Sequence, residues 1–268
     1  MKIGFFDSGL GGLTIFKEAI NIVKSNYIYL GDNKNAPYGI KEKEEIKKYI
    51  FENVEHLVKE GCNIIVIACN TATSIAIDEL REKYSNICII GTEPAVKIAV
   101  DSNSNKRVLV CATSITVKEG KLKKLIEKLD SESNVDVIAL DKLVQFAESK
   151  EIKLFENEPN QEVIQYIKEQ VNKFNISDYS HVVLGCTHFP LFKREFEVVF
   201  GKNIEVVDGS VGVAKNLQNK FKMLNEEQKI IDKNELKVKL INTKYNDVFV
   251  SKFEEITGIE SFEYEIKM

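Results

Sequence analysis

Two cysteines stand at positions where thiols can act as acids and bases. Cys69 follows the apolar run Ile64–Ala68, and Cys186 follows a similar run that ends at Gly185. A free thiol has a pKa of about 8.5, so its surroundings can favour either the thiol or the thiolate near neutral pH. If the two sulfurs flank one small ligand, one thiolate can remove a proton from a carbon atom while the opposite thiol delivers a proton to the other face. The pair therefore indicates inversion of an acidic C–H centre.

Burial without chemistry is the alternative for any cysteine, because free cysteines are among the most buried residues and usually act as small apolar groups. This interpretation suits Cys62, Cys88 and Cys111, which lie in or beside apolar runs. Cys69 and Cys186 differ, because each ends a predicted strand, is followed by polar residues and precedes a predicted helix. Amides at the start of a helix bind carboxylates and stabilise a thiolate. These matched positions favour a shared site.

Asp7 and His188 are the other candidates for proton chemistry. Asp7 opens the run Asp-Ser-Gly-Leu-Gly-Gly at the end of a buried strand, where it either caps the following helix or belongs to a site. His188 lies two residues after Cys186. It either packs against the next helix or orients Cys186 and exchanges protons with it. The other two histidines, His56 and His181, are predicted to be structural.

Cofactor and metal motifs are incomplete in this chain. The run Gly9–Gly12 lacks the third glycine of a GxGxxG fingerprint, and no GK[ST] sequence indicates a phosphate-binding loop. Asp32 follows the second predicted strand at a position that suits a ribose-binding acid, so a dinucleotide site stays an alternative. Cys69, Cys186 and His188 are zinc-type ligands, but no CxxC or HxxxH pair accompanies them. We therefore expect neither a metal nor an organic cofactor.

The elements that must position these residues alternate between buried strands and amphipathic helices. Short apolar runs predict strands at Ile3–Phe6, Tyr27–Leu30 and Ile64–Ala68. Apolar residues at helical spacing predict a helix after each strand, with the apolar faces Phe16, Ala19, Ile20 and Val23; Ile46, Ile50, Val54 and Leu57; and Ala72, Ile75, Ala76 and Leu80. This order predicts a doubly wound, mainly parallel sheet, in which ligands bind beyond the carboxyl ends of the strands.

The second half of the chain repeats this plan. After the polar, linker-like stretch Asp101–Asn105, strands are predicted at Arg107–Cys111 and His181–Gly185, and a helix is predicted from Pro190 onward. In each half an early strand runs into a hydroxyl-rich turn, and a later strand ends in a cysteine. We infer a diverged duplication that gives two pseudo-symmetric α/β domains with the active site in the cleft between them.

The predicted division puts residues 1–97 and 209–268 in the first α/β domain and residues 98–208 in the second. Asp208-Gly209-Ser210 is the predicted return crossing. A strand-like stretch, Lys237–Ile241, and a helix around Asp247–Ile256 follow it. We expect both to complete the first domain.

Composition narrows the class of protein. The 268 residues are 44% hydrophobic and 29% charged, which is ordinary for a globular chain with its own core. Basic residues number 37 and acidic residues 41, without a basic stripe, and this disfavours nucleic-acid binding. No apolar run approaches the roughly 20 residues of a membrane span, and the N-terminus does not resemble a signal peptide. Five cysteines without paired spacing indicate free thiols, so we expect a cytoplasmic protein.

Four sequence blocks together resemble the glutamate racemase family: Asp7–Thr14, Gly31–Gly39, Ala68–Ala72 and Leu184–Leu191. The resemblance runs nearly end to end, and the combination of blocks is highly specific. It implies two α/β domains with the active site between them, no cofactor, and the supply of D-glutamate for peptidoglycan in the cell wall. We accordingly predict glutamate as the substrate, a homodimer, and no nucleic-acid or membrane partner.

The resemblance also implies roles for individual residues. Cys69 and Cys186 match the catalytic pair, with Asp7 and His188 assisting the thiols. The substrate is expected to contact hydroxyl and backbone groups of Asp7, Ser8, Tyr38, Gly39, Asn70, Thr71, Thr187 and His188. Supporting roles in the second domain are expected for Thr113, Thr116 and Glu148.

Three stretches of the second half depart from the family pattern: Lys118–Lys121, Leu140–Glu148 and Asp208–Ser210. None of these departures removes a catalytic residue, but they affect the contacts expected from the second domain. An aspartate racemase, a non-catalytic amino-acid-binding protein and a Rossmann oxidoreductase are the competing interpretations. The presence of both cysteines argues against the binding protein.

Overall fold

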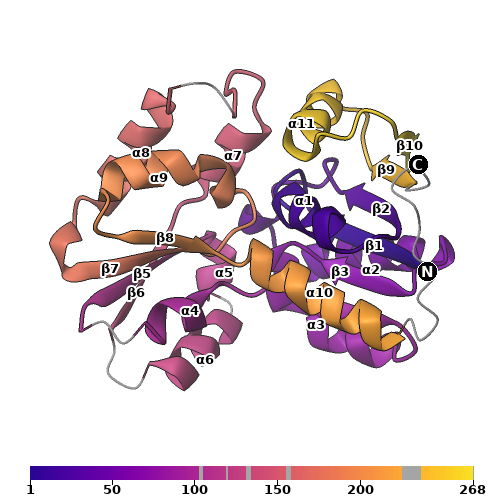
Figure 1. The fold of residues 1–268 in the computed structure, drawn as a ribbon, viewed down its shortest axis with the longest axis horizontal. Helices are drawn as coiled ribbons and strands as arrows, with labels where there is room; N and C mark the ends of the chain where they lie inside the picture. Colours follow the sequence, from indigo (N-terminus) through magenta and orange to yellow (C-terminus); the bar gives the residue numbers. More distant parts are fainter. Residues whose placement is uncertain (103–104, 119, 131–133, 155–157, 225–236, 268) are drawn as a thin grey trace.

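Two parallel β-sheets form the framework of the molecule. The computed structural model describes residues 1–102, 105–118, 120–130, 134–154, 158–224 and 237–267. Every strand pairing in both sheets is parallel. Figure 1 shows the sheets side by side, with helices packed around each. The predicted fold class, two doubly wound α/β units, is confirmed.

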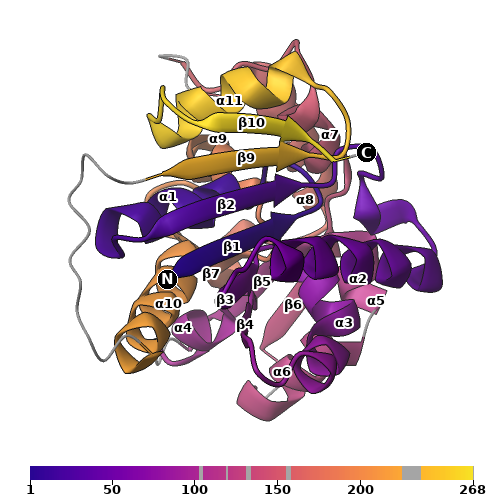
Figure 2. The ribbon, with the colours of Figure 1, turned by 90° about the vertical axis from the view of Figure 1, so that its right-hand side faces the viewer.

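Six strands form the first sheet, in the order β10-β9-β2-β1-β3-β4. Their bounds are β1 Lys2–Asp7, β2 Asn26–Gly31, β3 Ile64–Ile67, β4 Cys88–Gly91, β9 Val238–Asn242 and β10 Glu263–Ile266. Strands β9 and β10 come from the end of the chain and extend the sheet beyond β2 (Figure 2). Strand β1 has neighbours on both edges and is buried from Ile3 onward, which explains its continuous apolar run.

Helices cover both faces of the first sheet. Their bounds are α1 Leu13–Ile22, α2 Lys43–Lys59, α3 Asn70–Lys83, α10 Ser210–Leu224 and α11 Asp247–Thr257, with a short 3₁₀ helix, η1, at Tyr38–Ile40. Successive side chains of a strand point to opposite faces. Accordingly, Phe5 shares a core cluster with α1 and α11, whereas Phe6 shares one with α2 and α3. The first sheet is therefore packed on both sides.

Four strands form the second sheet, in the order β6-β5-β7-β8. Their bounds are β5 Arg107–Ala112, β6 Val135–Ala139, β7 Tyr179–Leu184 and β8 Glu205–Asp208. The accompanying helices are α4 Val96–Val100, α5 Ser114–Lys118, α6 Gly120–Leu129, α7 Lys142–Glu148, α8 Gln161–Val171 and α9 Lys193–Phe200, with 3₁₀ helices η2 at Ile176–Asp178 and η3 at Phe189–Phe192. Among the described residues, no helix combines the length and apolar character that crossing a membrane requires.

The strand order of the second sheet repeats that of the first. The last four strands of the first sheet, in the order β2-β1-β3-β4, correspond to the four strands of the second sheet, in the order β6-β5-β7-β8. In this correspondence β1 matches β5, and β3 matches β7. The cysteines that follow β3 and β7 therefore occupy equivalent places, as the internal repeat in the sequence predicts.

The chain crosses between the two sheets twice. Helix α4 packs against the second sheet, so the first crossing lies between Gly91 and Val96. The predicted division between residues 97 and 98 falls inside α4, and the predicted linker contains residues 103 and 104, which lie outside the described residues. After β8, helix α10 returns and packs against α1. The domain boundaries themselves stay a prediction.

Asp32 ties three segments of the first domain together. Its buried carboxylate accepts hydrogen bonds from the Tyr38 hydroxyl at 2.6 Å, from Asn53 Nδ2 at 3.0 Å and from Thr243 Oγ1 at 2.7 Å. Asn35 Nδ2 donates to both carboxylate oxygens. The loop after β2 is thereby joined to α2 and to the segment after β9. Because the carboxylate is occupied by these donors, the network argues against the dinucleotide alternative.

Replacing Asp32 with alanine should lower the free energy of unfolding by about 3 kcal/mol, because it leaves several buried donors without an acceptor. Denaturant unfolding followed by circular dichroism measures the change. Asp78→Ala is the matched control, since Asp78 is 80% exposed and forms a surface ion pair with Lys121; this pair is worth less than about 1 kcal/mol. Equal losses in the two variants would contradict the proposed role of Asp32.

Candidate active site

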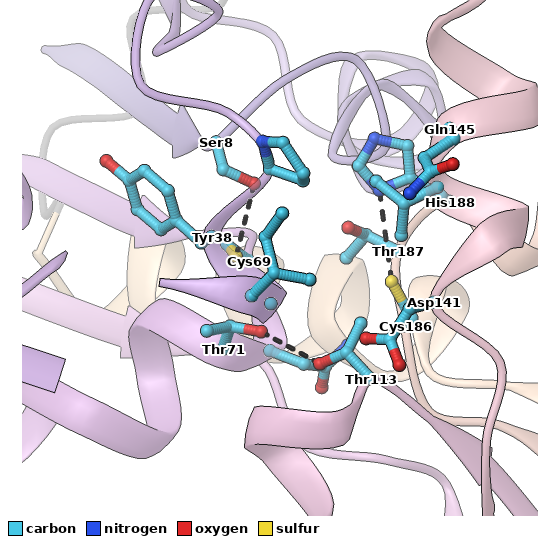
Figure 3. A pocket seen from close by; sticks show the side chains of 15 residues that line it. Ser8, Tyr38, Cys69, Thr71, Thr113, Asp141, Gln145, Cys186, Thr187 and His188 are labelled. Carbon is cyan, nitrogen blue, oxygen red and sulfur yellow. Dashed lines mark hydrogen bonds between the residues drawn. The ribbon is translucent and has the colours of Figure 1, made fainter. Parts of the chain in front are cut away.

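A pocket lies at the carboxyl ends of strands from both sheets, where open parallel sheets bind ligands. Segments that follow β1, β2, β3, β5, β6 and β7 line it. Figure 3 shows Cys69 and Cys186 on opposite sides of this pocket. The lining residues are Ser8, Pro37, Tyr38, Gly39, Ile40, Cys69, Asn70, Thr71, Thr113, Asp141, Val144, Gln145, Cys186, Thr187 and His188.

Cys69 is held at the start of a helix. It is the N-cap residue of α3, and its Sγ atom accepts a hydrogen bond from the Ala72 amide at 3.4 Å. The hydroxyl of Ser8 lies 3.6 Å from the same sulfur. Burial, and secondarily the carboxyl group of Asp7, raise the pKa of the Cys69 thiol to about 12. Cys69 is therefore a neutral thiol near neutral pH.

Cys186 is held differently, next to a histidine. Its Sγ atom lies 3.8 Å from Nδ1 of His188, and Nε2 of the same ring lies 2.8 Å from Oε1 of Glu148. Burial opposes protonation of His188, but Cys186 and Glu148 together raise the pKa of the imidazole well above its ordinary value. The prediction that both cysteines directly precede a helix is wrong for Cys186, because only η3 follows and regular helix begins at Lys193.

Glu148 joins the two domains at the edge of the site. Besides His188, its Oε1 atom accepts a hydrogen bond from the Leu10 amide at 2.9 Å, and Oε2 accepts one from Asn33 Nδ2 at 3.1 Å. A Cβ atom added at Gly9 would lie 2.0 Å from Oε1. A Cβ atom at Gly11 would lie 2.5 Å from Nδ1 of His188. These glycines therefore let the second domain approach the loop after β1.

Asp7 lies behind the pocket and does not cap α1. That helix begins at Leu13, with Gly12 at the N-cap. The fully buried carboxyl group of Asp7 instead accepts hydrogen bonds from the Gly9 amide at 2.8 Å and from the Thr187 hydroxyl at 3.1 Å. Burial raises the pKa of Asp7, and the nearby His188 opposes this effect. The bond to Thr187 is a second link between the domains.

Three threonine hydroxyls form a cluster across the domain boundary. Thr71 Oγ1 lies 3.2 Å from Thr113 Oγ1 and 3.3 Å from Thr116 Oγ1, and the last two lie 2.9 Å apart. Thr71 and Thr113 line the pocket, whereas Thr116 lies outside the lining. The hydroxyl of Tyr38 points away from the thiols in Figure 3, toward its bond with Asp32. Tyr38 therefore contributes its ring and backbone to the lining.

The structure adds lining residues that the sequence does not predict. Asp141 follows β6 and accepts hydrogen bonds from the amide and hydroxyl of Ser114. Val144 and Gln145 lie on α7, close behind it in the chain. Of the expected residues, Asp7, Thr116 and Glu148 contact lining residues without lining the pocket themselves. Asp141 lacked a sequence signal because β6 was not among the predicted strands.

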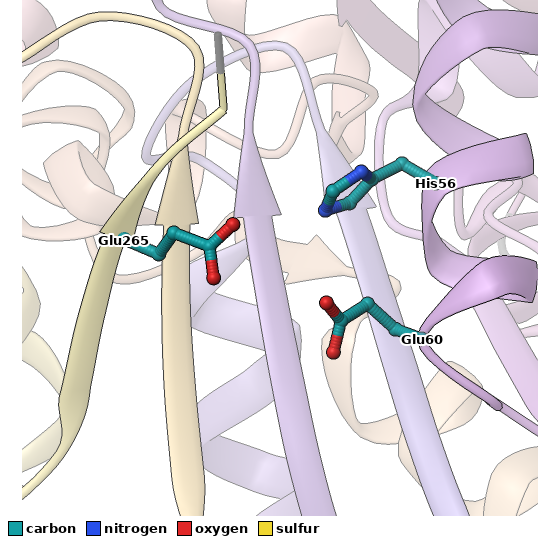
Figure 4. A group of neighbouring side chains, drawn as sticks. All are labelled: His56, Glu60 and Glu265. Atoms are coloured by element: carbon teal, nitrogen blue, oxygen red, sulfur yellow. The ribbon is translucent and has the colours of Figure 1, made fainter.

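One group of metal-type side chains occurs within the described part of the chain, and it lies outside the pocket. His56, Glu60 and Glu265 bring their ligand atoms within 4.8 Å of one another (Figure 4). Lys239 Nζ lies between the two carboxylates, 3.0 Å from Glu60 and 2.6 Å from Glu265. The lysine supplies the positive charge there. Over the same described residues, Cys69, Cys186 and His188 do not form such a group.

Comparison of this fold and site with known proteins defines the class of the protein as an amino-acid racemase, which is an isomerase. A family model described as Asp/Glu/Hydantoin racemase matches residues 14–215. Glutamate racemase 2 of Bacillus subtilis is 46% identical over 220 residues, which are 81% of each chain. The glutamate racemase of Lachnospira eligens is 48% identical over 221 residues, 82% of this chain and 81% of its own.

Solved structures agree with the sequence comparisons. The crystal structure of glutamate racemase from Francisella tularensis in complex with D-glutamate superimposes with a TM-score of 0.84 and 26% identity, over 100% of this chain and 97% of that chain. The chain belongs to the Asp/Glu/hydantoin racemase family, in the group whose members are named glutamate racemases.

The pKa of His188 gives a direct test of the site. Replacing Glu148 with glutamine should lower the pKa of His188 toward its ordinary value of about 6.5, because the partner loses its charge. Histidine NMR over a pH series measures the pKa of His188, and the spectra are simple because the chain has three histidines. Since the folded-state pKa is raised, the stabilising contribution of His188 is full below pH about 6.5 and is lost as the pH rises through the folded value.

His56 serves as the internal control in the same spectra. Burial lowers its pKa, and it belongs to the separate cluster around Lys239. Its titration should not change in the Glu148→Gln variant. If the pKa of His188 stayed at its wild-type value in this variant, the assigned electrostatic coupling would be wrong.

Proposed function

We propose that the protein is a glutamate racemase that interconverts L-glutamate and D-glutamate, with Cys69 and Cys186 as the two acid/base groups. The observation that carries the proposal is that two thiols, from equivalent strands of the two domains, line one pocket from opposite sides. Glutamate as the substrate rests on the relatives, which are named glutamate racemases, and on the Francisella enzyme, which was solved with D-glutamate.

The polar groups of the pocket suit an α-amino acid. Asn70 Oδ1 is buried and has no hydrogen-bond partner among the described residues, so it can accept from an ammonium group. The Asn70 and Thr71 amides, at the start of α3, have no partner within the helix and suit a carboxylate, whereas the Ala72 amide donates to Cys69. Hydroxyl groups of Ser8, Thr71 and Thr113 supply further donors, and the Thr187 hydroxyl, which donates to Asp7, can accept. The substrate is thereby expected to lie with its α-carbon between the sulfurs.

Two proton transfers accomplish the inversion. A thiolate on one side takes the α-proton, and the C–H electron pair stays on the substrate, shared between the α-carbon and its carboxylate. The thiol on the opposite side then gives its proton to the other face of the α-carbon and becomes a thiolate. No electrons are gained or lost, and no group leaves. The same groups exchange roles in the reverse direction.

The two thiols have different neighbours. Burial and Asp7 keep Cys69 as a thiol, which is the form that delivers a proton. His188, whose pKa is raised, carries its proton 3.8 Å from the sulfur of Cys186. The imidazole therefore places a positive charge on the Cys186 side of the pocket. Following the family resemblance, we assign Cys186 to L-glutamate and Cys69 to D-glutamate.

The proposal extends to the biological role. A cytoplasmic homodimer that needs neither a metal nor an organic cofactor would supply D-glutamate for peptidoglycan. This part of the proposal rests on the resemblance to glutamate racemases, which includes the sequence blocks around both cysteines. Asp7, Ser8, Gly39 and Thr187 are proposed to contact or support the substrate, and Thr116 and Glu148 to support the lining.

The purified protein, with nothing added, should racemise L-glutamate, because two thiols suffice as acid and base. Circular dichroism of the reaction mixture measures the rate. The rate should survive exhaustive chelation; loss that a metal restores would contradict the cofactor-free part. L-Aspartate should react more slowly, and a preference for aspartate would overturn the choice of substrate while leaving the two-thiol mechanism intact.

Cys69→Ser and Cys186→Ser should each nearly abolish racemisation, because a hydroxyl is too weakly acidic to replace a thiol in either role. Elimination from 3-chloroglutamate needs only one base, since loss of chloride replaces reprotonation. Each variant should therefore eliminate chloride from one enantiomer and not the other, with opposite preferences. Chloride release and 2-oxoglutarate formation measure this.

Cys88→Ser is the matched control, because Cys88 is a free, half-buried thiol of the first sheet that does not line the pocket. It should racemise glutamate at the wild-type rate. If both active-site variants preferred the same enantiomer, or if either racemised at a near-wild-type rate, the two-thiol mechanism would be ruled out.

A further inference from the structure

A buried lysine joins the last helix of the first domain to the end of α7. Lys252 lies on α11 and is only 6% exposed. Its Nζ atom donates hydrogen bonds to the carbonyl oxygens of Ala147 at 2.5 Å and Ser149 at 2.8 Å. Lysine is almost never fully buried unless its ammonium group has partners. Burial of this ammonium group therefore indicates a specific role for Lys252.

The two carbonyl groups lie on either side of Glu148, the last residue of α7. Carbonyl groups at the end of a helix have no partner within the helix, and a cation there satisfies them and complements the helix dipole. Lys252 thus fixes the backbone immediately before and after Glu148. The carboxylate of Glu148 then extends to the Leu10 amide and to Nε2 of His188.

The interaction is costly enough to need an explanation. Burial lowers the pKa of Lys252, while Glu148, Glu255 and Glu151 oppose this effect. A surface ion pair joins the same two segments without such a cost, between Lys150 and Asp247 at 3.6 Å. A surface ion pair therefore already links the end of α7 to α11, and the buried lysine is not needed for that link alone. The buried lysine provides in addition a fixed position for one backbone segment, which is the segment that carries Glu148.

We propose that Lys252 is a positioning residue for proton transfer at Cys186: it holds the end of α7 so that Glu148 keeps His188 in place beside that sulfur. The proposal rests on the proposed two-thiol racemase function. Lys252 has no hydrogen bond to Cys69 or to its partners Ser8 and Ala72. Replacing Lys252 should consequently slow proton transfer at the face of the substrate that Cys186 serves, and not at the face that Cys69 serves.

The test replaces Lys252 with methionine and follows each enantiomer of 3-chloroglutamate separately. Elimination from the enantiomer that depends on Cys186 should fall by about tenfold to a hundredfold, the size of effect that a small misplacement of a catalytic group produces. Elimination that depends on Cys69 should stay within about twofold of wild type, because among the described residues neither Lys252 nor Glu148 bonds to Cys69, Ser8 or Ala72. Lys150→Met is the matched control, and it should leave both rates unchanged.

The pKa of His188 separates positioning from a simple charge effect. Removing a nearby positive charge alone raises the pKa of an imidazole, whereas withdrawal of Glu148 from the ring lowers it. Histidine NMR of Lys252→Met should show a lower pKa for His188. In a Glu148→Gln background, Lys252→Met should cause little additional loss of the Cys186-dependent rate, because the two residues act through one interaction.

Three outcomes would contradict the positioning role of Lys252. Equal losses on both enantiomers, a raised pKa of His188, or a full additional loss in the Glu148→Gln background would overturn it. If Lys252→Met does not fold, Lys252→Gln keeps two N–H donors and should show the same one-sided loss to a smaller degree. Failure of the wild-type protein to racemise glutamate, or the same enantiomer preference in both cysteine variants, would instead reject the underlying function.

Discussion

The carboxylate of Glu148 is the interaction on which the arrangement of the pocket depends. It accepts hydrogen bonds from Leu10 and Asn33 of the first domain and contacts His188 of the second. Position 9 in the loop after β1 is a glycine because a side chain there would occupy the space of this carboxylate. This acidic group is thereby one of the links that hold the domains together, and it fixes where the imidazole beside Cys186 stands. Burial makes this dependence strong, because an unpaired carboxylate or imidazolium away from water is costly.

The same closeness gives the two sulfurs different surroundings. On the first-domain side the groups around Cys69 are a hydroxyl and a helix amide, together with the charge of Asp7. On the second-domain side Cys186 has an imidazole with its own carboxylate. Two residues of one type, at equivalent strand ends, thus have different polar and charged neighbours. Environment, and not residue type, distinguishes them.

Local patterns predicted what depends on local physics. Apolar runs and helical periodicity predict β1, β3, β5 and β7, and the cysteines at two of their ends indicate the pocket, because strand ends in a parallel sheet meet at one edge. Strands β4, β6 and β10 are short and partly exposed, so their patterns are weak, and Asp141 was missed with β6. The carboxylate network of Asp32 and the bonds of Lys252 join segments far apart in the sequence. Such contacts leave no periodic signal.

The repeated strand order of the two sheets parallels the equal free energies of substrate and product. Under the proposed reaction, substrate and product are mirror images with equal free energies in water, so the Haldane relation makes kcat/KM the same in both directions. A duplicated framework suits this symmetry, because each enantiomer meets an equivalent strand end and a thiol. The His188–Glu148 pair breaks the symmetry on one side only. Any difference that it causes between the two directions must therefore appear as compensating changes in kcat and KM, so that the enantiomer with the lower KM is also turned over more slowly.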